Sequence, residues 1–171
     1  MLVSRVLIPC LVAMVCFQAF SQQDELTKRN GFKDIKLGSP VDSIKGVKYK
    51  KDIKEKNEFP ASLYEVDHPD YKRIGEVVVK KLELKTYKGL IYQIEVITAK
   101  DTRLMKGMEQ LYGKPTYILP TDSYNWTSDS LSLTFKDHAK KEIRLTYRSY
   151  PVLKMMLADK GKKIEDIADD F

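Results

Sequence analysis

Two histidines are the first side chains to consider for chemistry, because imidazole can bind a metal ion or act as a general base. His68 lies between Asp67 and Asp70, and flanking carboxylates would suit either role. A polar turn around the neighbouring proline explains the same residues without a ligand. His138, within the polar run 136–141, fits an exposed hairpin turn. The two histidines share no motif, so the sequence predicts neither a catalytic residue nor a metal ligand.

Nucleophile and cofactor motifs are also missing from the sequence. No serine occurs in the glycine-framed elbow of hydrolases or in a Ser-x-x-Lys motif. There is no phosphate loop and no dinucleotide fingerprint, so no cofactor is predicted. A Ser-His-Asp triad is recognised by its geometry rather than by its spacing, which leaves a small hydrolase as an alternative.

The segment 45–56 holds six lysines in twelve residues, with Tyr49 among them. A basic stretch that contains an aromatic residue can contact an anionic lipid, a polysaccharide or a nucleic acid. The simpler interpretation is a solvated lysine face that is balanced by Asp52 and Glu55. Three of the lysines are candidate partner-binding residues: Lys48, Lys50 and Lys51.

Two arginines form a second candidate partner-binding site. Arg144 and Arg148 alternate with apolar residues, so both side chains should point to the polar side of one strand. Such a pair could bind a carboxylate or a phosphate through paired hydrogen bonds. The alternative is cross-strand pairing with an acidic residue, either Glu83 or Glu95.

Residues 1–21 have the layout of a secretory signal peptide. One basic residue precedes an apolar run at 6–17, and small residues stand just before the expected cleavage site. The run is shorter than the roughly 20 apolar residues of a membrane-spanning helix. Neither Cys10 nor Cys16 follows a small residue, as a lipoprotein signal requires. Cleavage after Ser21 is therefore favoured over lipidation or an uncleaved anchor.

The 30 basic and 24 acidic residues give the chain a net charge of +6. Removal of residues 1–21, with their one basic residue, would leave residues 22–171, a chain of 150 residues with a charge of +5 and no cysteine. Disulfide bonds, thiol nucleophiles and cysteine metal ligands would then be excluded. A chain of this size can form one core, so a single domain is predicted. An exported basic protein meets envelope components before nucleic acid, so neither a nucleic-acid partner nor stable membrane insertion is expected.

The apolar pattern after residue 75 predicts a hairpin, a helix and a three-stranded meander. Two β-rich runs surround Lys88-Gly89 within residues 76–97. Apolar residues at helical spacing follow, with Asp101 at the start and Gly113 at the end. Strands with one dry and one wet face are expected at 124–126, 131–135 and 143–147.

The remaining segments give weaker patterns. Ser39 can cap a short helix that starts at Pro40. Residues 22–30 resemble a loose polar leader, and residues 45–75 give no assignable pattern. After Pro151, two apolar stripes predict one bent helix or two short ones.

Together these elements predict an α+β domain: an antiparallel sheet of about five strands, with helices packed on one face. The core should form where the meander meets the helix that starts near residue 101. Its expected members are Trp126, Leu133, Phe135, Leu145 and Tyr147 on the sheet, and Leu104, Met108 and Leu111 on the helix.

Two short runs carry a family resemblance. The run FKDIKLGSP (32–40), and the run LYGKP (111–115) followed by an aromatic strand, resemble small uncharacterised exported proteins of Gram-negative bacteria. The pattern is also similar to outer-membrane barrel-assembly lipoproteins and to β-lactamase-inhibitor proteins. Those proteins are antiparallel sheets with helices on one face, and they act by binding proteins. The resemblance therefore implies a role in protein binding.

The sequence favours an exported, soluble, non-catalytic binding or interaction protein of the periplasm over an enzyme. The expected partner is a protein or an anionic envelope component, contacted through the open sheet face or the lysine-rich segment. Two alternatives remain open. One is a small periplasmic hydrolase, and the other is an inhibitor of a secreted enzyme that would use the loops at 65–71 and 136–141. The oligomeric state is left open.

Overall fold

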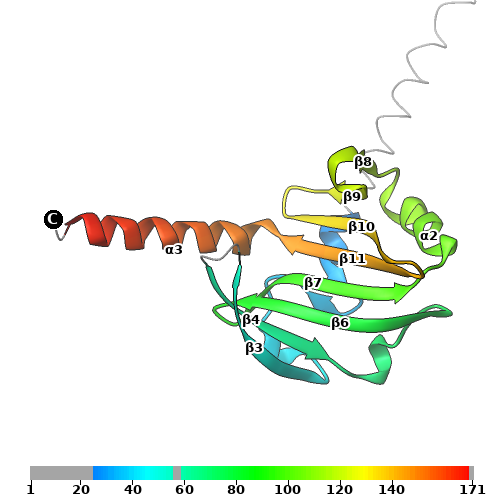
Figure 1. The fold of residues 1–171 in the computed structure, drawn as a ribbon, viewed down its shortest axis with the longest axis horizontal. Coiled ribbons are helices and arrows are strands. Elements are labelled where there is room, and N and C mark those ends of the chain that lie inside the picture. The colour runs from blue at the N-terminus through cyan, green and yellow to red at the C-terminus, as the bar shows by residue number, and fades with distance from the viewer. Residues whose placement is uncertain (1–24, 56–58, 170–171) are drawn as a thin grey trace, which may run out of the picture.

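A computed structural model describes residues 25–55 and 59–169, except for the side chains of residues 163–169, and shows a mostly β protein (Figure 1). Nine strands make one antiparallel sheet in the order β3-β4-β6-β7-β11-β10-β9-β8, with β5 paired to β6. A separate hairpin consists of β1 (Gly31–Phe32) and β2 (Ile35–Lys36). The strands of the large sheet are β3 (Val47–Glu55), β4 (Phe59–Val66), β5 (Arg73–Ile74), β6 (Val77–Tyr87), β7 (Leu90–Ala99), β8 (Thr116–Ile118), β9 (Ser123–Thr127), β10 (Leu131–Ala139) and β11 (Glu142–Ser149).

The large sheet consists of two meanders, each followed by a helix. Strands β3, β4, β6 and β7 form the first meander, and helix α2 (Thr102–Tyr112) follows it. Strands β8 to β11 form the second meander, and helix α3 (Tyr150–Asp169) follows it. The central strands β7 and β11 pair with each other, which leaves β3 and β8 at the two edges of the sheet.

The predicted hairpin, helix and three-stranded meander are confirmed. Lys88 and Gly89, between β6 and β7, have φ angles of 50° and 78°, the left-handed values that a two-residue hairpin turn requires. Helix α2 begins where the Asp101 carboxylate accepts a hydrogen bond from the backbone N–H of Arg103, at 2.8 Å. It ends at Gly113, which has a φ of 80°.

The unassigned segment 45–75 forms strands β3, β4 and β5, with the 3-10 turn η2 (Pro69–Tyr71) before β5. Residues 48–52 of β3 are all exposed, which removes the alternation that marks a strand in a sequence. Lysines on an edge strand discourage pairing with another chain, so the lysine run has a structural reason. Pro60 is tolerated because β6 pairs with β4 only between residues 62 and 65.

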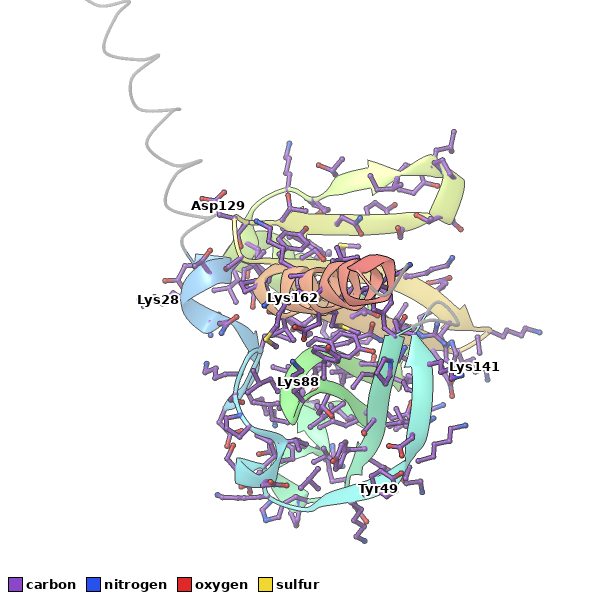
Figure 2. All side chains as sticks on the ribbon, turned by 90° about the vertical axis from the view of Figure 1, so that its left-hand side faces the viewer. Lys28, Tyr49, Lys88, Asp129, Lys141 and Lys162 are labelled. Atoms are coloured by element: carbon purple, nitrogen blue, oxygen red, sulfur yellow. The ribbon has the colours of Figure 1, made fainter. Side chains whose placement is uncertain are left out.

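Different elements cover the two faces of the sheet. Ile91 and Tyr92 are neighbours in β7 and point to opposite faces; Ile91 belongs to the main core, whereas Tyr92 belongs to a smaller second cluster. The N-terminal segment and α2 cover the main core. Val152 and Met156 of α3 join the second cluster, and α3 then continues beyond the sheet (Figure 1). Figure 2, a view along α3, shows Lys28 and Lys141 on opposite sides of this helix.

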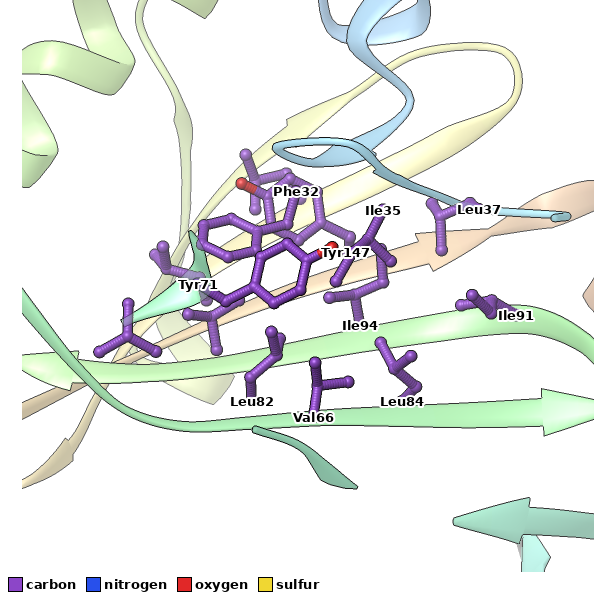
Figure 3. Packing of buried hydrophobic residues seen from close by; sticks show 14 of the residues in the cluster. Phe32, Ile35, Leu37, Val66, Tyr71, Leu82, Leu84, Ile91, Ile94 and Tyr147 are labelled. Carbon is purple, nitrogen blue, oxygen red and sulfur yellow. The ribbon is translucent and has the colours of Figure 1, made fainter. Parts of the chain in front are cut away.

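The main core lies between the N-terminal segment and the sheet (Figure 3). Phe32 and Ile35 come from the β1–β2 hairpin and face Ile94 of β7, and neither isoleucine has any exposed surface. The predicted core residues of the meander and of α2 are buried here: Trp126, Leu133, Phe135, Leu145, Tyr147 and Leu104. Met108 packs against this core, and Leu111 is half-buried.

The predicted fold class is wrong. The protein is not an α+β domain with a sheet of about five strands, because it has a nine-stranded antiparallel sheet and is mostly β. Strands β3, β4, β5 and β8 have no recognisable strand pattern in the sequence, because they are short, lie at an edge or are interrupted by proline. The helices are not confined to one face either, because α3 packs on the face opposite to α2.

Two local predictions also need correction, and one open alternative is decided. Residues 136–139 continue β10, so His138 lies in a strand and the turn is shorter than predicted. Ser39 does not cap a helix; its hydroxyl donates to the backbone oxygen of Lys36, and only a 3-10 turn, η1 (Val41–Ser43), follows. Of the two alternatives for the C-terminal segment, one helix or two, the structure has one helix, α3. Among the described residues, no helix combines the length and the apolarity needed to cross a membrane.

Candidate ligand-binding pocket

A pocket of about 560 Å³ opens between α2, the β1–β2 hairpin and the turn that joins β5 to β6. Leu145 and Tyr147 of β11 line it from the sheet, and Phe32 lines it from the hairpin. These residues also belong to the main core. The volume lies in the range of sites for drug-sized ligands. The pocket is therefore a gap between the sheet and the elements that cover it, large enough for a small molecule.

Helix α2 presents its apolar stripe to this pocket. Leu104, Met108, Leu111 and Tyr112 recur at the spacing of one helix face and all line the pocket. Leu104 is buried in the core, whereas the other three are only partly buried. The helix face predicted from the sequence therefore packs on the sheet with one part and borders an open pocket with the rest.

Gly107 lies in the middle of α2 and also lines the pocket. A Cβ atom at this position would meet no heavy atom within 4 Å, so packing does not require glycine here. Glycine inside a helix costs about 0.5–1 kcal/mol relative to alanine. A side chain at this position would extend into open space next to the pocket lining, and a ligand site would explain this local cost in stability.

Two tyrosines of the pocket have hydroxyl groups that can be compared with the hydrogen bonds of the described residues. Within the described chain, neither Tyr112 nor Tyr147 forms a hydrogen bond through its hydroxyl. The Tyr147 side chain is 5 % exposed, and its ring centroid lies 6.5 Å from that of Phe32. Burial and the nearby Tyr112 raise the pKa of Tyr147, and the Arg29 guanidinium opposes this rise. Neither hydroxyl is among the fully buried polar atoms that lack a partner in the described residues, which belong to Thr98, Asn125 and Arg144. Both hydroxyls are therefore accessible from the pocket and can donate to a ligand.

The rim of the pocket beside α2 has an unusual backbone. Asn30, Gly31 and Lys33 have φ angles of 45°, 147° and 54°. A Cβ on Gly31 would lie 2.1 Å from the carbonyl oxygen of Ile35, so the β1–β2 hairpin requires glycine. A residue other than glycine in the left-handed region costs about 1–3 kcal/mol and is often found at functional sites. This backbone places basic side chains along the rim.

Basic residues outnumber acidic residues around the pocket. The charged residues that line it are Arg29, Lys33, Lys36, Arg103 and Glu76. The Lys36 ammonium donates to the carbonyl oxygen of Arg29 at 2.7 Å, and the Lys33 ammonium donates to the carbonyl oxygen of Asp70. Within the described residues, neither lysine lies within ion-pair distance of a carboxylate. The charge of these two lysines is therefore not offset by a direct ion pair.

The positive charges of the two arginines at the pocket rim are offset by ion pairs with carboxylates. Arg103 forms ion pairs with Asp101 and Glu76, at 2.8 Å each. Arg29 lies 3.2 Å from a carboxylate oxygen of Glu25, one helical turn before it. The net positive charge of the pocket edge therefore comes mainly from the two lysines.

The structure does not join the two histidines into a site. His68 Nδ1 accepts a hydrogen bond from the backbone N–H of Asp70 at 3.3 Å and so caps η2, which confirms the polar-turn interpretation. His138 Nδ1 lies 2.6 Å from a guanidinium nitrogen of Arg144 at the exposed end of β10. In residues 25–55 and 59–169, no group of three His, Cys, Asp or Glu side chains could hold a metal ion.

Arg144 and Arg148 lie on one face of β11, as the alternation predicts, but they do not form a joint anion site. They are four residues apart along the strand, or about 13 Å. Arg144 Nε lies 3.3 Å from a carboxylate oxygen of Glu95, and Arg148 Nε donates to the side-chain oxygen of Gln93 at 3.0 Å. The cross-strand alternative is therefore confirmed for Glu95.

The lysine candidates lie on the edge strand β3. Lys48, Lys50 and Lys51 are exposed, and the Lys50 ammonium lies 2.7 Å from a carboxylate oxygen of Glu65 on β4. The acidic residue that balances Lys50 is therefore on the neighbouring strand, rather than being Asp52 or Glu55. Partner binding through these lysines stays a prediction.

Most residues of the pocket were not recognised as functional from the sequence. Arg29 lies in the segment interpreted as a loose leader, and the tyrosines and leucines of the pocket have the pattern of core residues. Two signals could have indicated the site: the pair Asn30-Gly31 before an apolar residue, and Gly107 in the middle of an amphipathic helix.

The fold and the pocket define a mostly β protein with a ligand-sized pocket between its sheet and one helix. In comparisons with known proteins, no family model, no curated protein and no solved structure matches the chain. The resemblance to exported proteins of Gram-negative bacteria therefore stays a prediction, and function has to be argued from the pocket.

Proposed function

We propose that this chain is an exported, non-catalytic binding protein that holds a small, largely apolar ligand in the pocket beside α2. The observation that carries the proposal is the 560 Å³ pocket lined by Phe32, Leu104 and Leu145, with Gly107 of α2 also in its lining. Apolar surface that leaves water for such a site contributes about 25 cal/mol per Å². Part of this gain would offset the local cost of glycine in the helix.

Export to the periplasm or the medium rests on the pattern of residues 1–21, which lie outside the described residues. Envelope compartments contain many small apolar molecules, so this location suits a binding protein. The expected partner, a protein or an anionic envelope component, stays part of the proposal. A small anionic component would suit the basic edge of the pocket. No contact among the described residues favours the hydrolase or the enzyme inhibitor over this function.

The test uses the only tryptophan of the chain as a reporter. The ring centroid of Trp126 lies 6.4 Å from that of Tyr112, which lines the pocket. A neutral apolar fluorophore, N-phenyl-1-naphthylamine, should therefore quench Trp126 emission by energy transfer as it binds. We expect a saturable titration with one site per chain.

Two leucine variants of α2 make the test specific to the pocket. Gly107→Leu should reduce the space in the pocket and weaken the titration, whereas Gln110→Leu places the same side chain at an exposed position outside the pocket and should leave the titration intact. No saturable quenching in the wild type, or equal quenching in the Gly107→Leu variant, would contradict the proposal.

A further inference from the structure

We infer that the ligand of this pocket is a single-chain amphipathic anion, with its acyl chain against the apolar lining and its carboxylate beside Lys36 and the hydroxyls of Tyr112 and Tyr147. This inference names the ligand class of the proposed binding function and therefore rests on it.

The charge of the rim indicates an anion. Four basic side chains line the pocket against one acidic side chain, and Lys33 and Lys36 bind backbone carbonyl oxygens rather than carboxylates. A carbonyl oxygen orients an ammonium group but does not neutralise it. The two lysines can therefore attract a negatively charged group without breaking an existing ion pair. A cationic headgroup would be repelled at the same place.

The two hydroxyls indicate where the anion lies. Tyr147 is almost fully buried, lines the pocket, and makes no hydrogen bond through its hydroxyl among the described residues. A carboxylate can accept hydrogen bonds from Tyr147 and Tyr112 together, and bonds to a charged acceptor are about twice as strong as neutral ones. A neutral, purely apolar ligand would leave both donors unsatisfied.

The size of the pocket limits the apolar part of the ligand. A volume of about 560 Å³ is in the middle of the range for small-molecule sites and suits one acyl chain. A two-chain phospholipid would have to leave one chain in water. The occupant we assign is therefore a free long-chain carboxylate rather than a membrane lipid.

The wild-type experiment compares three probes of equal chain length by isothermal titration calorimetry: dodecanoate, methyl dodecanoate and dodecyltrimethylammonium. We expect dodecanoate to bind at least about tenfold more tightly than the neutral ester, and the cation to bind most weakly. Octanoate and decanoate should bind more weakly than dodecanoate, by about fourfold for each methylene group that they lack. The preference for dodecanoate should shrink at high salt.

A variant that removes one oxygen tests the position of the headgroup. Tyr147→Phe keeps the ring in the core and should leave the thermal stability unchanged, because the hydroxyl makes no hydrogen bond to residues 25–55 or 59–169. It should weaken dodecanoate binding by about tenfold and leave the ester unchanged. Tyr71→Phe is the matched control, because the Tyr71 hydroxyl donates to Asp34 at 3.2 Å and does not line the pocket. The control should lose stability but keep its affinity for dodecanoate.

A second pair of variants tests the charge. Lys33→Gln with Lys36→Gln should remove most of the preference for dodecanoate over the ester. Lys54→Gln with Lys154→Gln changes the net charge equally, at exposed residues that do not line the pocket, and should keep the preference.

The outcomes separate this inference from the proposed function. Equal affinity for dodecanoate and its ester, equal affinity for the cationic probe, or no effect of Tyr147→Phe on dodecanoate would overturn the inference, while saturable binding of N-phenyl-1-naphthylamine would leave the proposed function standing. If neither the fluorophore nor any of the acyl probes binds, the proposed function fails and the inference fails with it.

Discussion

Replacement of Gly107 by alanine should stabilise the protein, although most substitutions destabilise. Gly107 is the sixth residue of the eleven in α2, and its φ angle is not among the positive values of the chain. A Cβ atom would meet nothing within 4 Å. The new methyl group therefore causes no clash, and because it points into open space it gains little from burial.

The expected gain follows from the helix alone. Alanine is favoured over glycine in a helix interior by about 0.8–1.0 kcal/mol. Leu104 anchors α2 in the main core, so stability gained by the helix should count toward global unfolding. For a domain of 150–250 residues, 1 kcal/mol corresponds to a rise in Tm of about 2–4 °C. Gly107→Ala should therefore raise the Tm by about that amount.

Urea unfolding followed by circular dichroism, together with differential scanning calorimetry, would measure this change. Gly161→Ala is a matched control, because Gly161 lies in α3 and a Cβ atom there also has open space. Both variants should be at least as stable as the wild type, but only the substitution at Gly107 should reduce binding of the apolar fluorophore. A loss of more than about 0.5 kcal/mol in Gly107→Ala would refute the reasoning, because it would mean that the pocket is closed at this position.

Four further predictions concern the core, the hairpin, the response to pH and the processing of the chain. Phe135→Ala should cost on the order of 3–5 kcal/mol in urea unfolding, and a cost below about 1 kcal/mol would contradict the burial of this ring. Gly31→Ala should destabilise by more than about 2 kcal/mol, because its Cβ would collide with the backbone of Ile35; an unchanged Tm would count against the hairpin geometry. Burial and a hydrogen bond to a carboxylate raise the pKa of Tyr71 to about 12, above the value of about 10 in an unfolded chain. The folded state therefore holds this proton longer, stability should fall as the pH rises from 10 to 12, and Tyr71→Phe should reduce that fall; an equal fall in the variant would show that other groups cause it. Mass spectrometry of the exported protein should show a chain that begins near Gln22 without an acyl group, and a lipid-modified cysteine would contradict this.

Local signals in the sequence were sufficient for about half of the fold. The hairpin of β6 and β7 and helix α2 are recognisable because Lys88-Gly89, Asp101 and Gly113 mark their ends chemically. Strand β3 is not recognisable, because residues 48–52 of this edge strand are all exposed and so show no apolar alternation. The predicted sheet therefore had too few strands, about five rather than nine.

Features that depend on distant contacts were missed. The apolar stripe of α3 predicts that Val152 and Met156 need a partner, but it does not indicate which face of the sheet provides one. Leu26 is almost fully buried by contacts with distant strands, although the segment around it is polar. The pocket depends on this segment, so its basic rim could not be assembled from sequence spacing alone.

Binding of a long-chain carboxylate in the pocket beside α2 can be measured by nuclear magnetic resonance of the full chain during titration with dodecanoate. We expect saturating shifts of the Gly107 amide and of the ring signals of Tyr112 and Tyr147. Tyr92, which packs under α3 on the opposite face of the sheet, should not shift. Saturating shifts centred on Tyr92, or no saturating shift at Gly107 and the two tyrosines, would contradict the account.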